Sequence, residues 1–207
     1  MRRLVAILAT LAALGDAEAA RRAWNFKVYL DGEAIGRHNF TADAQGGELR
    51  LASSAKFEVR FLLVTVYSYD HRAEERWRAG CLTGLEARTV TNGTVEEARL
   101  TRAAGRWQVS RPAGREEHEG CLKSFAYWDP AILGAPRLLN SQTGELTPVT
   151  TAFVGNETRA VRGRPTETRR HRLTGTRLAI DLWYAGDEWV ALESATDGGR
   201  LLRYELE

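Results

Sequence analysis

The sequence predicts an all-β protein, an antiparallel meander curled into a half-barrel or barrel. Three observations predict this fold class. Segments in which apolar and polar residues alternate recur along the chain, as expected for strands because successive side chains point to opposite faces of a sheet. Glycine-containing turns separate these segments. After the N-terminal segment, no stretch with helical periodicity exceeds about ten residues, so short antiparallel strands must supply the core.

The N-terminal segment has the three zones of a secretory signal peptide. Arg2 and Arg3 precede the apolar run from Leu4 to Leu14, and Ala17-Glu18-Ala19 supplies the small residues of a cleavage site. The alternative is a helix packed into the fold, but the apolar run is short for that. The run is also too short to cross a bilayer, which takes about 20 apolar residues. We expect residues 1–19 to be removed. Residues 20–207 would then form a single antiparallel β domain, exported to the periplasm and soluble, with no stable membrane insertion.

The strands follow in order along the chain. Trp24 to Leu30 alternates cleanly, and Asp31-Gly32 then favours a hairpin. The clearest case is Leu49 to Phe61, a long strand with one solvated face that follows the turn Gln45-Gly46-Gly47. The expected strands are 24–30, 34–41, 49–61, 69–78, 82–90, 94–101, 106–111, 137–140, 146–154, 157–161, 166–173, 178–184, 188–194 and 201–206.

Two segments break the alternation. Leu62 to Tyr67 is apolar throughout, so it is either buried on both sides or briefly helical. Cys121 to Leu133 is dense in aromatic residues and contains Asp129-Pro130. We expect a short helical or loop segment near 121–133, laid against the sheet so that its aromatic side chains fill the space there.

The two cysteines, Cys81 and Cys121, favour a disulfide, because two thiols in an oxidising compartment tend to pair where geometry allows. Two reduced, buried cysteines acting as small apolar residues are the alternative. A bridge would close a loop of about 40 residues and contribute roughly 3 to 4 kcal/mol.

Charge and motifs indicate no chemistry. The 29 basic and 27 acidic residues are scattered and give a net charge of +2, which argues against a nucleic-acid-binding stripe. The basic run Arg169–Arg172 is more typical of a solvated strand. The four histidines are far apart in sequence, and Glu116–Glu119 reads as an exposed loop more readily than as a cation site. No nucleophile, phosphate-loop or zinc motif is present, so we predict no catalytic residue, metal or cofactor.

Aromatic residues supply the remaining signal. Their simplest role is core packing. The alternative is that a curved sheet leaves a concave apolar surface for an apolar ligand. The candidate ligand-binding residues are Tyr67, Trp77, Phe125, Tyr127, Trp128 and Trp183.

Several motifs resemble an uncharacterised family, a domain of unknown function found in exported proteins of Gram-negative bacteria, along nearly the whole chain after the signal peptide. The matching pieces are Trp24–Gly32 with Ile35-Gly36, Trp77-x-x-Gly80-Cys81-Leu82, Ser124–Pro130, Leu138–Glu145 and Asp181–Tyr184. The resemblance implies a bridge between Cys81 and Cys121. The family pattern expects an acidic pair where this chain has Val90-Thr91, so a carboxylate function there does not carry over. No activity is established for the family. Its sequences are similar in character to those of exported half-barrel proteins that hold lipids, and this similarity is an analogy between folds.

Three hypotheses follow for the function. The leading one is a periplasmic binding or carrier protein for a lipid-like or other apolar molecule. The alternative is a non-catalytic cell-envelope module that pairs a strand edge or an apolar patch with an unknown protein partner. An enzyme that uses Asp129, Asp181 or a histidine comes third, because it would require a strongly perturbed carboxylate or imidazole in a cleft.

Overall fold

The computed structural model describes residues 20–61, 64–196 and 198–207, so the predicted signal peptide lies outside the described residues. No helix in this part of the chain has the length and apolar character needed to cross a membrane. The elements are β1 (Ala20–Leu30), β2 (Glu33–Gln45), β3 (Glu48–Phe61), β4 (Val64–Arg78), β5 (Cys81–Thr91), β6 (Thr94–Ala103), β7 (Arg106–Arg111), β8 (Gly114–His118), the 3-10 helix η1 (Pro130–Gly134), β9 (Arg137–Leu139), β10 (Leu146–Val161), β11 (Arg164–Gly175), β12 (Leu178–Ala185), β13 (Glu188–Ala195) and β14 (Leu201–Leu206).

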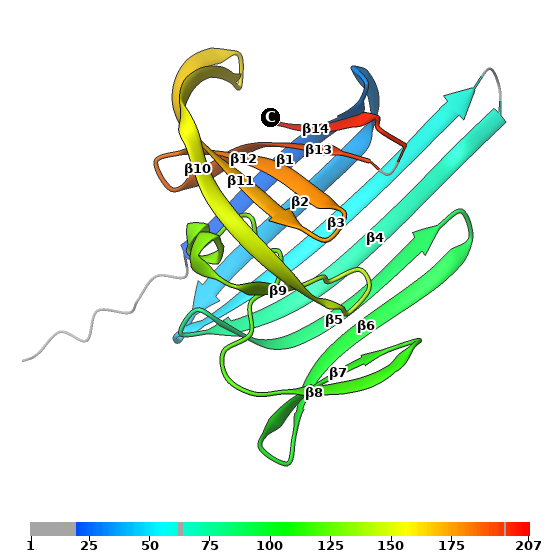
Figure 1. Ribbon diagram of the computed structural model, residues 1–207, viewed down its shortest axis with the longest axis vertical. Helices are drawn as coiled ribbons and strands as arrows, with labels where there is room; N and C mark the ends of the chain where they lie inside the picture. Colours follow the sequence, from blue (N-terminus) through cyan, green and yellow to red (C-terminus); the bar gives the residue numbers. More distant parts are fainter. Residues whose placement is uncertain (1–19, 62–63, 197) are drawn as a thin grey trace, which may run out of the picture.

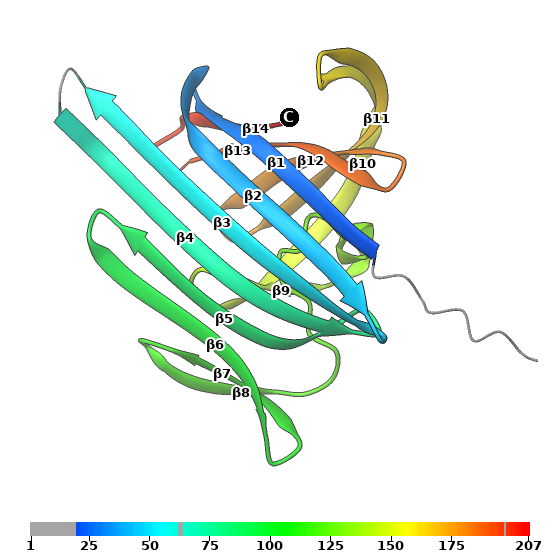
Figure 2. The ribbon, with the colours of Figure 1, turned by 180° about the vertical axis from the view of Figure 1, so that it is seen from behind.

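All these strands belong to one 14-stranded sheet, in the order β8-β7-β6-β5-β4-β3-β2-β1-β14-β13-β12-β11-β10-β9. Neighbouring strands are antiparallel, and β1 pairs with β14, so the first and last strands lie side by side in the middle of the sheet. The sheet curls until β10–β13 lie across the concave side of β1–β4 (Figures 1 and 2). The end strands β8 and β9 do not pair with each other. The predicted all-β half-barrel is therefore confirmed.

The alternating strands bury one face in a shared aromatic core. In β1, Trp24 and Phe26 are almost fully buried. The Trp24 ring lies 6.3 Å from that of Trp128, and the Phe26 ring lies 4.2 Å from that of Trp189 in β13. Large rings in such tilted contacts supply most of the apolar area that a curled sheet buries.

A short segment, residues 121–125, joins the two sides of the curled sheet. The Leu82 N–H at the start of β5 donates to the carbonyl oxygen of Leu122 at 2.8 Å. The Leu139 N–H in β9 donates to the carbonyl oxygen of Lys123 at 2.8 Å, and the Phe125 N–H donates back to Leu139 at 3.1 Å. We call residues 121–125 the closing segment, because it links β5 to β9 although these strands do not pair.

The predicted disulfide fixes one end of this segment. Cys81, the first residue of β5, is bonded to Cys121, with Cα atoms 5.1 Å apart. Beyond the closing segment, the Asp129 side chain accepts a hydrogen bond from the Ala131 N–H at 3.0 Å and caps η1. The expected short helical segment near 121–133 is thus confirmed, with its helix at Pro130–Gly134.

The interpretation of residues 62–67 was wrong for its described part. Residues 64–66 are neither helical nor buried on both sides but begin β4, and Val64 and Val66 are 64% and 54% exposed. The ends of β3 and β4 beside the β3–β4 hairpin extend beyond the neighbouring strands (Figure 2).

Two strand assignments also differ. The strands expected at 146–154 and 157–161 are one strand, β10, which continues through a β-bulge between Phe153 and Gly155. A bulge adds a residue and bends a strand without ending it. The Glu116–Glu119 group is not wholly a loop, because Glu116 to His118 belong to the edge strand β8.

Candidate functional site

An apolar cavity of about 630 Å³ is lined by residues of β1 to β4, the β9–β10 loop, the β13–β14 loop and β14. We call it the outer cavity. Its walls are aliphatic and aromatic, and include Leu30, Ile35, Phe57, Val59, Tyr69 and Leu202. Among the described lining residues, Arg200 alone carries a charge.

Arg200 is held at the rim by an ion pair. Its Nε donates to Asp31 Oδ2 at 2.6 Å, and the Leu201 N–H donates to Asp31 Oδ1 at 2.8 Å. The hydrogen bond from Arg200 and that from Leu201 lower the pKa of the Asp31 carboxyl. This contact links the β1–β2 turn to the β13–β14 loop, so it holds these two parts of the rim together.

A second, smaller cavity of about 230 Å³ lies beside residues 125–128. We call it the inner chamber. It is lined from β2, β3, β4 and β12, from Phe125–Trp128 and from residues 140–142 of the β9–β10 loop. Gln142 lines both cavities. The wall between them is thin, because the Tyr204 hydroxyl of the outer cavity lies 3.3 Å from Nδ1 of His38 in the inner chamber.

Glu75 is a buried carboxyl group of the inner chamber. Two groups donate hydrogen bonds to its Oε2, the Trp77 indole N–H at 2.9 Å and the Ser124 hydroxyl at 3.1 Å. Desolvation raises the pKa of Glu75 to about 7, and the two hydrogen bonds only partly offset this rise. Glu75 is therefore close to half-protonated at neutral pH, which is uncommon for a carboxyl group.

Two histidines line the same chamber and are held neutral. Burial lowers the pKa of His38 to about 3, with a smaller contribution from His71. Burial also lowers the pKa of His71 to about 4, although Asp70 opposes this. The His71 Nδ1 lies 2.9 Å from the Thr89 hydroxyl. None of His38, His71 and Glu75 was predicted from the sequence as a site residue.

The predicted ligand-binding residues fall in four places. Tyr67 lines the outer cavity, whereas Phe125, Tyr127 and Trp128 line the inner chamber. Trp77 lines neither of the two cavities. It is core, packed edge-on against Trp128 with ring centroids 5.5 Å apart.

Trp183 lines neither the outer cavity nor the inner chamber. Its ring lies under the guanidinium groups of Arg159 and Arg170, at 4.0 and 5.1 Å, and its indole N–H donates to Glu157. The hydroxyl of the next residue, Tyr184, donates a hydrogen bond to the carbonyl oxygen of Tyr127. The pairing of β12 with β13 shifts register between these two residues.

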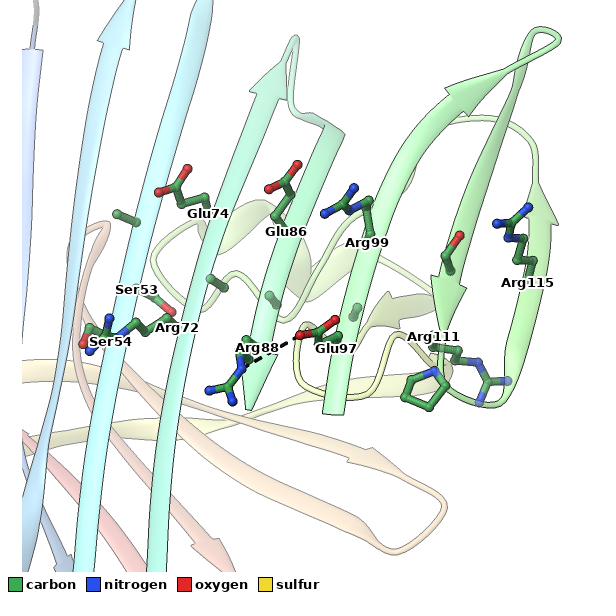
Figure 3. A pocket seen from close by; sticks show the side chains of 16 residues that line it. Ser53, Ser54, Arg72, Glu74, Glu86, Arg88, Glu97, Arg99, Arg111 and Arg115 are labelled. Atoms are coloured by element: carbon green, nitrogen blue, oxygen red, sulfur yellow. Dashed lines mark ion pairs between the residues drawn. The ribbon is translucent and has the colours of Figure 1, made fainter. Parts of the chain in front are cut away.

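A larger concavity of about 820 Å³ crosses β3 to β8 (Figure 3). Its charged side chains have both signs, and like charges stand directly opposite each other in the Arg72–Arg88 and Glu74–Glu86 pairs. Arg88 is paired with Glu97 of β6 at 3.9 Å. These charged side chains are exposed, so solvent screens them, and the groove has the character of a solvated sheet face.

The inner chamber lacks the arrangement of a hydrolytic site. Ser124, which donates to Glu75, is 1% exposed and does not line the chamber. The carboxylates suggested from sequence lie elsewhere: Asp129 caps η1, and Asp181 is paired with Arg170 and Arg172. In the described part of the chain, no three His, Cys, Asp or Glu residues are placed to hold a metal ion.

Comparisons with known proteins agree with this fold. A family model described as "Domain of unknown function (DUF6134)" matches residues 26–207. The chain is similar to the crystal structure of a beta-barrel-like protein of domain of unknown function DUF1849 from Brucella abortus, with a TM-score of 0.65 and 9% sequence identity, over 91% of this chain and 95% of that chain. The comparison with curated proteins gave no match. At this identity the structural similarity concerns the fold alone.

Proposed function

We propose that this chain, which belongs to the DUF6134 family of domains of unknown function, is a binding or carrier protein that holds a lipid-like or other apolar molecule in its outer cavity. The observation that carries the proposal is the cavity itself. Its volume of about 630 Å³ falls within the range of small-molecule sites, roughly 300 to 1,000 Å³. A cavity of this size lined by aliphatic and aromatic groups favours an apolar occupant, because burying apolar surface contributes about 25 cal/mol per Å².

The exposed end of the β3–β4 hairpin suits the entry of such a molecule. Val66 lines the outer cavity and is 54% exposed, and Val64 beside it is 64% exposed. Exposed aliphatic side chains beside an apolar cavity provide a first contact surface for a ligand that leaves a membrane or another carrier.

The proposed location is the periplasm. Two features support it, the signal-peptide pattern of residues 1–19 and the Cys81–Cys121 disulfide, because such bonds persist in oxidising compartments. The mass of the chain recovered from the periplasmic fraction of a Gram-negative host tests this directly. We expect a product that starts at Ala20 or Arg21, whereas an intact chain in the cytoplasmic fraction would exclude export.

Blocking the cavity tests the carrier function. Val59 in β3 is half-buried and lines the outer cavity, so Val59→Trp should fill part of the space and weaken the binding of a fluorescent C12 fatty-acyl probe at least tenfold. The matched control is Val95→Trp on β6, where the valine is 45% exposed and lines neither cavity. We expect the control to bind like the unmodified chain. Equal binding by both variants, or no uptake of the probe by the unmodified chain, would exclude the outer cavity as the site.

The interaction-module alternative receives less support from the sheet edges. The edge strand β8 has five residues, and Arg115, Glu116 and Glu117 are exposed on it. Short, charged edge strands are a common means of preventing strand addition. At the other end of the sheet, β9 is occupied by its backbone hydrogen bonds to the closing segment. A protein partner would therefore need to bind a face of this molecule and not an edge.

A further inference from the structure

The outer cavity combines a buried apolar lining with one charged residue that solvent reaches. Leu30, Phe57 and Tyr204 line the cavity and are at most 8% exposed. Arg200 also lines it, and the side chain of this arginine is 46% exposed. The buried part of the cavity is therefore apolar, and a cation lies where the cavity meets solvent.

The chain around Arg200 fixes the place of this cation. Arg200, Leu202 and Tyr204 are spaced two residues apart, and all three line the cavity. Because alternate residues of an extended chain share a face, Arg200 continues the face that Leu202 and Tyr204 present. The Asp31 N–H donates to the carbonyl oxygen of Leu201 at 2.9 Å. The backbone beside Arg200 is thus bonded to the β1–β2 turn.

The ion pair with Asp31 engages only one of the three guanidinium nitrogens. Nε of Arg200 donates to Asp31 Oδ2, whereas Nη1 and Nη2 have no hydrogen-bond partner in the described part of the chain. The other carboxylate oxygen, Oδ1, accepts from the Leu201 N–H. Asp31 therefore holds the arginine in place and leaves two of its nitrogens available to donate to a ligand.

Another arginine of this chain shows that one guanidinium can pair with two carboxylates. Arg159 lies 3.5 Å from Glu157 and 2.9 Å from Glu193. A guanidinium presents its N–H groups in a planar fork that matches a carboxylate or a phosphate. Asp31 offsets part of the charge of Arg200, and solvent screens an exposed pair, so we expect a modest contribution to affinity.

We propose that the outer cavity binds amphiphiles with an anionic head group, a carboxylate or a phosphate. Nη1 and Nη2 of Arg200 donate to the head group, and the apolar chain lies among the aliphatic and aromatic side chains of the cavity. This inference rests on the proposed carrier function and narrows its ligand class. Neutral and cationic amphiphiles with the same chain lack the contact with Arg200.

A displacement assay with C12 compounds tests the head-group preference. Dodecanoate, dodecyl phosphate, 1-dodecanol and dodecyltrimethylammonium would each compete with the neutral fluorescent probe N-phenyl-1-naphthylamine at pH 8, where dodecanoate is ionised. We expect Arg200→Gln to weaken at least one of the two anions about three- to fivefold, the size of an exposed ion pair. The affinities of the alcohol and the cation should not fall. The anion that loses more affinity identifies the preferred head group.

The matched control is Arg169→Gln. The Arg169 side chain is 51% exposed, pairs with Asp187 at 3.6 Å and lines neither cavity. This variant has the same net charge as Arg200→Gln, so it separates a local contact from a change in overall charge. We expect it to bind all four compounds like the unmodified chain.

Salt provides a second test that needs no substitution. An exposed arginine is screened by ions. Raising NaCl from about 20 mM to about 500 mM should therefore weaken the preferred anion relative to 1-dodecanol in the unmodified chain. A ratio of the two affinities that does not change with salt would overturn the inference.

The outcomes separate the two proposals. If Arg200→Gln weakens all four compounds equally, or weakens neither anion relative to Arg169→Gln, the head-group assignment is wrong and the carrier function stands. If neither the probe nor any C12 compound binds to the folded chain, the carrier function fails as well. Near-ultraviolet circular dichroism identifies a variant that has lost its fold, and the salt dependence of the unmodified chain then decides the outcome.

Discussion

At the scale of single residues, the inner chamber depends on polar side chains that occupy inward positions of β4. Tyr69, Ala73 and Trp77 alternate on the buried face, and His71 and Glu75 lie between them on that face. A polar residue at an inward position is expensive unless its hydrogen bonds are satisfied. His71 and Glu75 follow the same two-residue alternation in the sequence, so the sequence pattern could have predicted that both side chains point inward.

The pKa of Glu75 predicts a measurable dependence of stability on pH. Burial raises this pKa from 4.5 to about 7, so the folded state prefers the protonated form. This preference stabilises the fold fully below about pH 4.5, and the stabilisation is lost as the pH rises to about 7. The difference corresponds to roughly 3 kcal/mol. Glu75→Gln keeps an oxygen acceptor for Trp77 and Ser124 and removes the titration. We expect its stability relative to the unmodified chain to increase by roughly that amount between pH 4.5 and pH 8.

Urea unfolding at pH 4.5, 6 and 8 measures this change. The lowered pKa values of His38 and His71 make the stability of both proteins fall as the pH drops below about 6.5, so only the difference between the proteins reports on Glu75. A difference that stays constant across these pH values would show that Glu75 titrates normally.

At the scale of elements, the curl of the sheet depends on irregular points in long strands. The pairing of β1 with β2 shifts register after Val28, opposite Gly36. Gly36 has φ of +155°, and a Cβ added there would lie 1.9 Å from the carbonyl oxygen of Lys56 in β3. Close approach of β2 to β3 at this point therefore requires glycine.

Substitution of this glycine should disturb the sheet more than substitution of a turn glycine. We expect Gly36→Ala to destabilise the fold by roughly 3 kcal/mol or more, because it adds a backbone clash to an unfavourable φ. The control is Gly32→Ala, where φ is +88° and nothing lies within 4 Å of the added Cβ. It should cost only about 1 kcal/mol. Thermal unfolding of both variants compares them, and equal losses would mean that β2 can move away from Lys56.

At the scale of the whole molecule, the curled sheet is held together by contacts between segments far apart in sequence. The closing segment links β5 to β9, and the Cys81–Cys121 disulfide fixes its start. The aromatic residues that follow it enter the core, where Trp128 meets Trp24 and Trp77. One stretch of irregular chain thus substitutes for the pairing that the end strands do not make.

Removal of the disulfide should weaken this closure. The bridge spans 40 residues of sequence, which corresponds to roughly 3 to 4 kcal/mol of stabilisation by restriction of the unfolded chain. We expect the Cys81→Ala/Cys121→Ala variant to lose about that much free energy of unfolding in urea. Hydrogen exchange should also become faster at the amides of Leu82 and Leu139, which bond to the closing segment. An unchanged unfolding free energy would assign the closure to the hydrogen bonds and the aromatic core.

Most strands could be predicted because alternation is a local signal. Trp24 to Leu30 and Leu49 to Phe61 each contain a repeated two-residue pattern that only an extended chain buries on one side. The continuity of β10 and the exposure of residues 64–66 could not be predicted. Both depend on which other elements lie against a strand, and periodicity within one segment does not carry that information.

The candidate site also has features with a local sequence signal and features that depend on tertiary contacts. The sequence by itself determined the fold class, the disulfide partners and the aromatic character of residues 125–128, because each follows from composition or spacing along the chain. Only the tertiary structure decided that Trp183 lies under two arginines, and that His38 and Glu75 line one chamber beside an apolar cavity. Those relations join residues from different strands, and they are set by the curl of the sheet and by the closing segment, which no local pattern specifies.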